Sequence, residues 1–124
     1  MRPLLVVALM LWAAVGLAQE GPPAPVAVVA ENEVVQVLRM SIPPHARTPM
    51  HDVTPRVVIW LSDAHFVDRF ADGTTREERR KAGDAEWVSA RRHAGENLSD
   101  KSMDFIAVIV KPPGAGAQRG PHQP

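Results

Sequence analysis

Short runs of β-branched and apolar residues, separated by turn residues, constrain this chain more than any other feature. In one run, Leu38, Met40 and Ile42 alternate with Arg39 and Ser41. This is the period-two pattern of a half-buried strand. Similar strand-like runs cover residues 26–30, 34–42, 57–61, 66–70, 75–81, 86–90 and 103–110.

Turn residues separate these runs, and long helical periodicity is absent. Pro43-Pro44 ends the second run because proline supplies no hydrogen-bond donor to a sheet. Asp72-Gly73 predicts a hairpin, and Gly83-Asp84 predicts a second turn. The charged run at 75–81 suits a solvated outer strand, with arginines and glutamates paired along it. Several short strands with turns between them predict an all-β barrel or sandwich.

Length and composition narrow the class of protein. The chain has 124 residues, which favours one domain, and 45% of them are hydrophobic, enough for a packed core. The formal net charge is zero, which argues against a nucleic-acid partner, since such proteins carry a basic surplus. The sequence contains no cysteine, so disulfides and thiol catalysis are excluded.

The N-terminus has the pattern of an export signal. Arg2 supplies a positive charge, an apolar run of 15 residues covers Leu4 to Ala18, and small residues precede Gln19. That run is shorter than the roughly 20 residues that span a bilayer. We therefore expect a cleaved signal peptide and a periplasmic or extracellular protein without a stable membrane anchor. The predicted division is signal peptide 1–18, flexible leader 19–25, barrel 26–111 and disordered tail 112–124.

Five motifs follow one another between about residues 33 and 111. They are Pro43-Pro44-His45-Ala46-Arg47-Thr48-Pro49-Met50-His51, Val57-Val58-Ile59-Trp60-Leu61, Asp72-Gly73, Gly83-Asp84-Ala85-Glu86-Trp87-Val88 and His93-Ala94-Gly95-Glu96-Asn97. Their order resembles that of small single-domain cupins. The resemblance implies an antiparallel jelly-roll β-barrel with a site in its mouth. It also implies that chains of this kind pair as homodimers.

Cupins commonly hold a divalent metal in that site, through two histidines spaced HxH, a carboxylate and a later histidine. In this sequence His51 and His93 fit the first and the last histidine. Val53 stands where the second histidine is expected, and the carboxylate position also falls on valine. His45 is a candidate third ligand if the proline-rich loop folds it inward, and an exposed loop residue otherwise. A catalytic metal normally needs three protein ligands.

Aromatic and amide side chains are further candidates for the pocket. Trp87 and Phe105 could reach the barrel mouth, although packing in the core is the default for aromatic residues in small barrels. Asn97 lies four residues after His93 and is the third pocket candidate. Glu96 could act as an acid or base only if a bulge at Gly95 turned it inward.

Three functions remain open at this point. The first is an exported cupin-fold protein that binds a small molecule, with or without a divalent metal. The second is a metal-dependent enzyme, oxygenase-like or isomerase-like, that uses His45, His51 and His93. The third is a scaffold without a working site. No catalytic residue can be named, because the same barrel hosts many unrelated activities.

Overall fold

The computed structural model describes residues 26–114, and in this range it contains nine β-strands and no helix. The strands are β1 (Val26–Glu31), β2 (Val35–Ile42), β3 (His51–Val53), β4 (Arg56–Trp60), β5 (Ala64–Phe70), β6 (Thr75–Arg80), β7 (Ala85–Val88), β8 (Arg91–Asn97) and β9 (Met103–Val110). The all-β prediction is confirmed. The predicted signal peptide, the leader and the tail beyond residue 114 lie outside the described residues.

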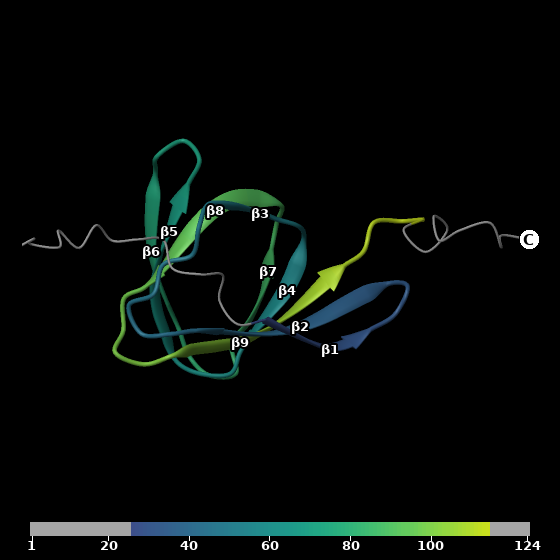
Figure 1. Cartoon of the computed structure of the whole chain (residues 1–124), viewed down its shortest axis with the longest axis horizontal. Helices are drawn as coiled ribbons and strands as arrows, with labels where there is room; N and C mark the ends of the chain where they lie inside the picture. Colours follow the sequence, from purple (N-terminus) through teal and green to yellow (C-terminus); the bar gives the residue numbers. More distant parts are fainter. Residues whose placement is uncertain (1–25, 115–124) are drawn as a thin grey trace, which may run out of the picture.

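The strands form two antiparallel sheets that close around a shared interior (Figure 1). One sheet has the order β1-β2-β9-β4-β7, and the other has the order β3-β8-β5-β6. Most neighbours in these orders are not consecutive in the chain, as expected of a jelly roll. This topology brings β3 and β8, which carry the two motif histidines, side by side in one sheet.

Both predicted turns are present. Gly73 lies between β5 and β6 with a φ of 86°, and its N–H donates to the carbonyl of Phe70. Gly83 lies between β6 and β7 with a φ of 91°. Positive φ values favour glycine because a Cβ would crowd the backbone there. Glycine at these positions therefore sets where β6 begins and ends.

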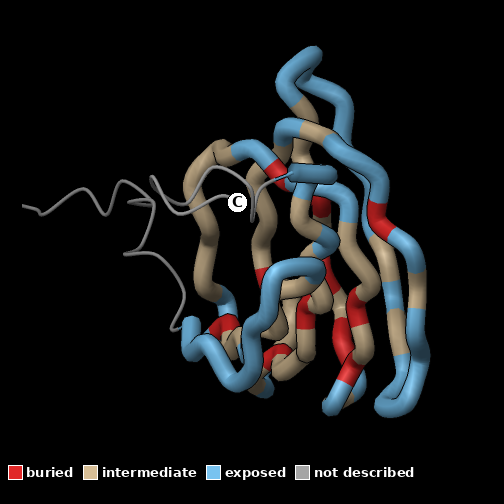
Figure 2. The backbone as a smooth tube through the Cα atoms, turned by 90° about the vertical axis from the view of Figure 1, so that its right-hand side faces the viewer, coloured by how far each residue is buried: buried red, intermediate tan, exposed pale blue. Residues whose placement is uncertain are grey.

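The hydrophobic core lies between the sheets, and the exposed segments are mostly turns and sheet edges (Figure 2). Leu38, Ala107 and Val58 face one another across β2, β9 and β4, and Ala107 is completely buried. The main cluster of buried apolar residues comprises Ile42, Val53, Val58, Trp60, Ala64, Phe66, Val88 and Met103. This cluster fills only part of the interior.

The β1–β2 ribbon extends away from the closed part of the barrel (Figure 1). All six residues of β1 are exposed, including three valines. Within residues 26–114 there is no helix that could cross a membrane.

Candidate functional site

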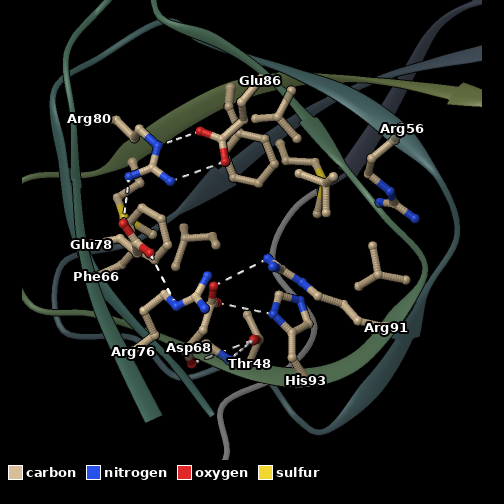
Figure 3. A pocket seen from close by; sticks show the side chains of 18 of the residues that line it. Thr48, Arg56, Phe66, Asp68, Arg76, Glu78, Arg80, Glu86, Arg91 and His93 are labelled. Carbon is tan, nitrogen blue, oxygen red and sulfur yellow. Dashed lines mark hydrogen bonds and ion pairs between the residues drawn. The ribbon is translucent and has the colours of Figure 1, made fainter. Parts of the chain in front are cut away.

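A cavity of about 500 Å³ lies between the two sheets. Its apolar side follows from the register of the strands: Met40, Phe105 and Trp60 lie directly opposite one another on β2, β9 and β4. The indole of Trp60 contacts both neighbouring aromatic rings, with centroids 5.0 Å from Phe105 and 5.2 Å from Phe66. Charged side chains and the imidazole of His93 line the remainder of the cavity (Figure 3), together with the imidazole of His51.

The two motif histidines face each other across β3 and β8. His51 and His93 are direct partners in the antiparallel register, so both side chains project from the same face of the sheet. Their ring centroids are 4.8 Å apart, and the ring planes make an angle of 58°. Both residues line the cavity. The sequence motifs therefore converge on one place in the fold.

Each imidazole is oriented through its Nδ1 atom. Nδ1 of His51 lies 2.7 Å from the carbonyl oxygen of Pro49, which can only accept a hydrogen bond, so this nitrogen carries the proton. Nδ1 of His93 lies 3.0 Å from Oδ1 of Asp68, an acceptor when ionised. In the neutral form of each ring, Nε2 is left as a lone-pair acceptor. Two basic nitrogens are thus available at this side of the cavity.

Asp68 is one of the charged residues of this site that were not predicted from the sequence. The residue is 4% exposed, and its Oδ2 accepts a hydrogen bond from Arg91 at 3.2 Å. The sequence does contain a feature that points to Asp68: it falls between Phe66 and Phe70 in the period-two pattern of β5, at a position that faces inward. An aspartate on the apolar face of a strand is informative, since buried carboxylates need partners. Asp68 finds these partners in His93 and Arg91.

A second polar group is built around Arg80. Its guanidinium donates to both carboxylate oxygens of Glu86, and a further N–H donates to Glu78 at 3.0 Å. Glu86 also accepts the indole N–H of Trp60 at 3.0 Å. The hydrogen bond to Glu86 is the main reason that the pKa of Arg80 is raised. Burial alone would raise the pKa of Glu86, but hydrogen bonds from Arg80 and Trp60 lower it below its usual value.

β6 is the edge strand of its sheet and four of its six residues are exposed, as predicted for a solvated outer strand, but alternate side chains of β6 also line the cavity. Arg76 and Glu78 lie directly opposite Asp68 and Phe66 of β5, so they share the inner face of the sheet. Arg80 follows on that face, and its guanidinium lies 5.6 Å from the ring centroid of Phe66. The charge pairing was predicted correctly. The direction of alternate side chains was not, because an evenly charged strand has no apolar face to fix its orientation.

His45 does not join the other two histidines. It has a φ of 59° in a turn closed by a hydrogen bond from Ala46 N–H to the Pro43 carbonyl. Its Nε2 lies 2.7 Å from Asp100, and its side chain is 63% exposed. The proline-rich turn therefore directs the imidazole outward. His45 is not among the residues that line the cavity.

The three predicted pocket residues have different surroundings. Phe105 and Trp87 line the cavity, and Trp87 is more than half exposed at its edge. Asn97 is completely buried, and its amide nitrogen lies within hydrogen-bond distance of the carbonyls of Ile42, Pro43 and Lys101. Asn97 thus connects β8 to the segments that follow β2 and precede β9, and it does not line the cavity.

The donor set can be tested against the metal that the resemblance implies. Among residues 26–114, no group of three histidine, cysteine, aspartate or glutamate side chains is placed to hold a metal ion. His51 and His93 supply two nitrogens, whereas Asp68 is already bound to His93 and Arg91. A catalytic site normally has three protein ligands. The described residues therefore do not fit a resident catalytic metal.

Glu96 lies on the opposite face of β8 from His93. The register between β5 and β8 is regular from Phe66↔Asn97 to Phe70↔His93, so Gly95 introduces no bulge. The carboxylate of Glu96 is bound to Arg69 at 2.9 Å and to Arg47 at 3.2 Å. These contacts give Glu96 a role in fastening the loop before β3 to the sheet.

Comparisons with known proteins identify the fold. The sequence matches no protein-family model and no curated protein. A cupin domain from Bordetella pertussis Tohama I is similar in structure, with a TM-score of 0.67, 22% identity, and coverage of 73% of this chain and 96% of that one. An RmlC-like cupin with a double-stranded β-helix fold from Methanocaldococcus jannaschii gives a TM-score of 0.57, 15% identity, and coverage of 82% and 91%.

A third similar structure carries a functional description. It is a predicted oxalate decarboxylase from Thermotoga maritima, with a TM-score of 0.51, 24% identity, and coverage of 68% of this chain and 77% of that one. At these identities the likeness concerns the fold. The expected resemblance to cupins is confirmed at this level: the chain folds as a small cupin-type jelly-roll barrel.

Proposed function

We propose that this chain is an exported binding protein that holds a small molecule in the mouth of its cupin-type barrel. The cavity of about 500 Å³ is the observation that carries the proposal. Its size lies in the range of about 300–1,000 Å³ that is usual for small-molecule sites. An apolar wall with a few convergent polar groups is also usual for such sites. The cupin fold supports a ligand in this position.

A resident metal is not needed for this function. Two imidazoles without a third ligand give a weak site for a divalent ion. A metal-dependent enzyme remains the alternative if a ligand comes from outside residues 26–114 or from the bound molecule. Elemental analysis of purified protein and of a His51→Ala/His93→Ala variant distinguishes a metal-free binding protein from a metal-dependent enzyme. Stoichiometric metal that disappears in the variant would contradict a metal-free binding site.

A second candidate is acid–base catalysis of an isomerase-like reaction. The hydrogen bond between Asp68 and His93 favours it, because a carboxylate on Nδ1 orients the ring and leaves Nε2 to accept a proton. His51 lies beside His93, with ring centroids 4.8 Å apart, so the same bound molecule can contact both imidazoles. Exchange of a substrate proton with deuterated solvent, lost in His93→Gln, would support this candidate. Binding without any exchange would leave the binding protein as the function.

Narrowing the mouth of the barrel tests the binding function. Ala90 is exposed at the edge of the cavity, so Ala90→Trp should obstruct entry without disturbing the core. Ala82→Trp, in the exposed turn between β6 and β7, is the matched control. We expect calorimetric binding of small amphipathic molecules to weaken at least tenfold in the first variant, about 1.4 kcal/mol, and to stay unchanged in the control. Equal affinities in both variants would refute a ligand site in the barrel.

Export and self-association complete the proposal. The apolar run at residues 4–18 supports export, and the N-terminal sequence of protein recovered outside the cytoplasm would test cleavage before Gln19. The exposed valines of edge strand β1 support a homodimer, since unpaired edge strands favour association. Light scattering of the purified protein measures its oligomeric state. A monomer at high concentration would contradict the dimer.

A further inference from the structure

Arg56 and Arg91 lie at the same side of the cavity as His93 (Figure 3). Arg56 begins β4 and shares the inner face of that strand with Val58 and Trp60, since alternate residues of a strand point the same way. Arg91 begins β8 two residues before His93 and lies on the same face as that histidine. Both arginines line the cavity.

Arg91 has a hydrogen-bond donor that nothing in the described structure accepts. One terminal nitrogen donates to Asp68 at 3.2 Å. Its Nε atom is buried, and among residues 26–114 it has no hydrogen-bond partner. A guanidinium has five N–H donors in a fixed fork, so one carboxylate contact leaves most of them available. A buried donor without a partner is costly, and an acceptor from a ligand would remove that cost.

Arg56 has no carboxylate partner within residues 26–114. Its hydrogen bonds go to the carbonyl and the hydroxyl of Thr54, at 2.9 and 3.3 Å. Burial, and then the like charge of Arg91, lowers the pKa of the Arg56 guanidinium below its usual value. The guanidinium stays charged at neutral pH all the same. Two cations that destabilise each other form a site where an anion would be stabilised.

The carboxylates around the cavity do not supply that anion, because each is already bound to arginine. Of the carboxylates that point inward, Asp68 pairs with Arg91, Glu78 with Arg76 and Arg80, and Glu86 with Arg80. Glu96 points from the other face of β8 and pairs with Arg47 and Arg69, neither of which lines the cavity. With Arg56 added, four guanidinium groups of the cavity lining face three carboxylates. The difference, one positive charge, leaves room for an anionic ligand next to Arg56.

We propose that Arg56 and Arg91 bind the carboxylate of an organic acid whose apolar part lies against Trp60 and Phe105. The inference rests on the proposed binding function and names its ligand class. Planar guanidinium groups match a carboxylate through paired hydrogen bonds. The aromatic wall formed by Trp60, which lies farther along β4 from Arg56, and by Phe105 on β9 suits a ring or an alkyl chain on the same molecule.

Calorimetric titration with three matched probes tests this ligand class. The probes are 4-phenylbutyrate, the neutral 4-phenylbutan-1-ol and 4-phenylbutyl phosphate, which differ only in the head group. We expect the carboxylate to bind about tenfold or more tightly than the alcohol, because hydrogen bonds to charged groups are the strong ones. Equal affinity of acid and alcohol would overturn the carboxylate site while leaving a binding cavity. Tighter binding of the phosphate would assign the site to phosphate esters instead.

The variant Arg56→Gln distinguishes the contribution of the head group to affinity from that of the apolar cavity. We expect it to weaken 4-phenylbutyrate about tenfold or more and to change the affinity for the alcohol less than about twofold. Arg56→Lys keeps the positive charge but loses the planar guanidinium with its paired donors. Its affinity for 4-phenylbutyrate should lie between those of Arg56→Gln and the wild type. Arg92→Gln is the control, since Arg92 is paired with Asp52 on the other face of β8.

Two further outcomes would overturn the proposal. In the first, Arg56→Gln binds 4-phenylbutyrate as tightly as Arg92→Gln does. In the second, the wild type binds none of the three probes. Failure of the first kind, with the alcohol still bound and still blocked by Ala90→Trp, leaves the proposed function in place. The second outcome would count against both the carboxylate site and the proposed binding function.

Discussion

Replacing Glu86 by glutamine tests whether the charged network on one side of the cavity stabilises the barrel. Glu86 lies directly opposite Val58 across β4 and β7, and its carboxylate receives N–H groups from both Trp60 and Arg80. Glutamine has nearly the same shape but only one acceptor oxygen. Its NH₂ group would therefore face one of these donors.

The cost follows from the hydrogen bonds that glutamine cannot accept. Hydrogen bonds to charged groups contribute about 1.5–3 kcal/mol each, and the Glu86 side chain is 28% exposed, which favours the lower end. Arg80 keeps its hydrogen bond to Glu78 in the variant, which limits the loss further. We expect the free energy of unfolding to fall by about 2 kcal/mol at pH 7. For a domain of this size the Tm should fall by about 10 °C.

The pH dependence of this difference is a second part of the same prediction. The pKa of Glu86 is lowered in the folded protein from an ordinary value of 4.5. Its contribution to stability is therefore complete above that ordinary value and is lost as the pH falls through the folded-state pKa. Glutamine does not titrate. The gap between wild type and variant should stay constant from pH 7 to pH 5.5 and shrink below about pH 4.5.

Urea unfolding followed by tryptophan fluorescence measures both quantities. Glu77→Gln is the control, because Glu77 lies on the outer face of β6 and pairs with His65 at the surface. The control should destabilise the protein much less than Glu86→Gln. Equal effects of the two variants would refute the reasoning. A gap that stays the same down to pH 3 would refute it as well.

Three further predictions concern stability and use the same unfolding assay. Asn97→Ala should cost about 3 kcal/mol, because it leaves buried carbonyls without donors, and a loss below 1 kcal/mol would contradict its role between loops. Asp68→Asn should cost about 3 kcal/mol by leaving Arg91 without a buried counter-charge and His93 without a carboxylate acceptor; an unchanged Cm would show that these contacts are not stabilising. Gly83→Ala should cost about 1–2 kcal/mol from its positive φ alone, since nothing lies near a Cβ there, and Ala82→Gly is the control.

The strand pattern of this chain could be predicted because its apolar residues alternate clearly. Strands β2, β4 and β9 have β-branched and apolar sequences, and glycine fixes the turns at Gly73 and Gly83. The short strand β3 (His51–Val53) was not among the predicted strands. Its pairing with β8 depends on contacts between distant segments, which local sequence does not determine.

The candidate site was predictable only in part. His51 and His93 could be placed by motif, and the register of β3 and β8 brings them together. Asp68 was missed because the phenylalanines of its strand dominate the period-two pattern and the carboxylate between them belongs to no motif. The outward direction of the His45 side chain depends on the positive φ of this residue, which the prolines and histidines of this loop do not predict.

The central claim is that an organic acid binds inside the barrel. An NMR titration of ¹⁵N-labelled protein with 4-phenylbutyrate tests it most directly. We expect the largest shifts for the Trp60 indole N–H, the Arg56 and Arg91 side chains, and the amides of β4 and β8, with little change in β1. Shifts confined to the exposed β1–β2 ribbon, or an unchanged Trp60 indole at saturation, would contradict the account.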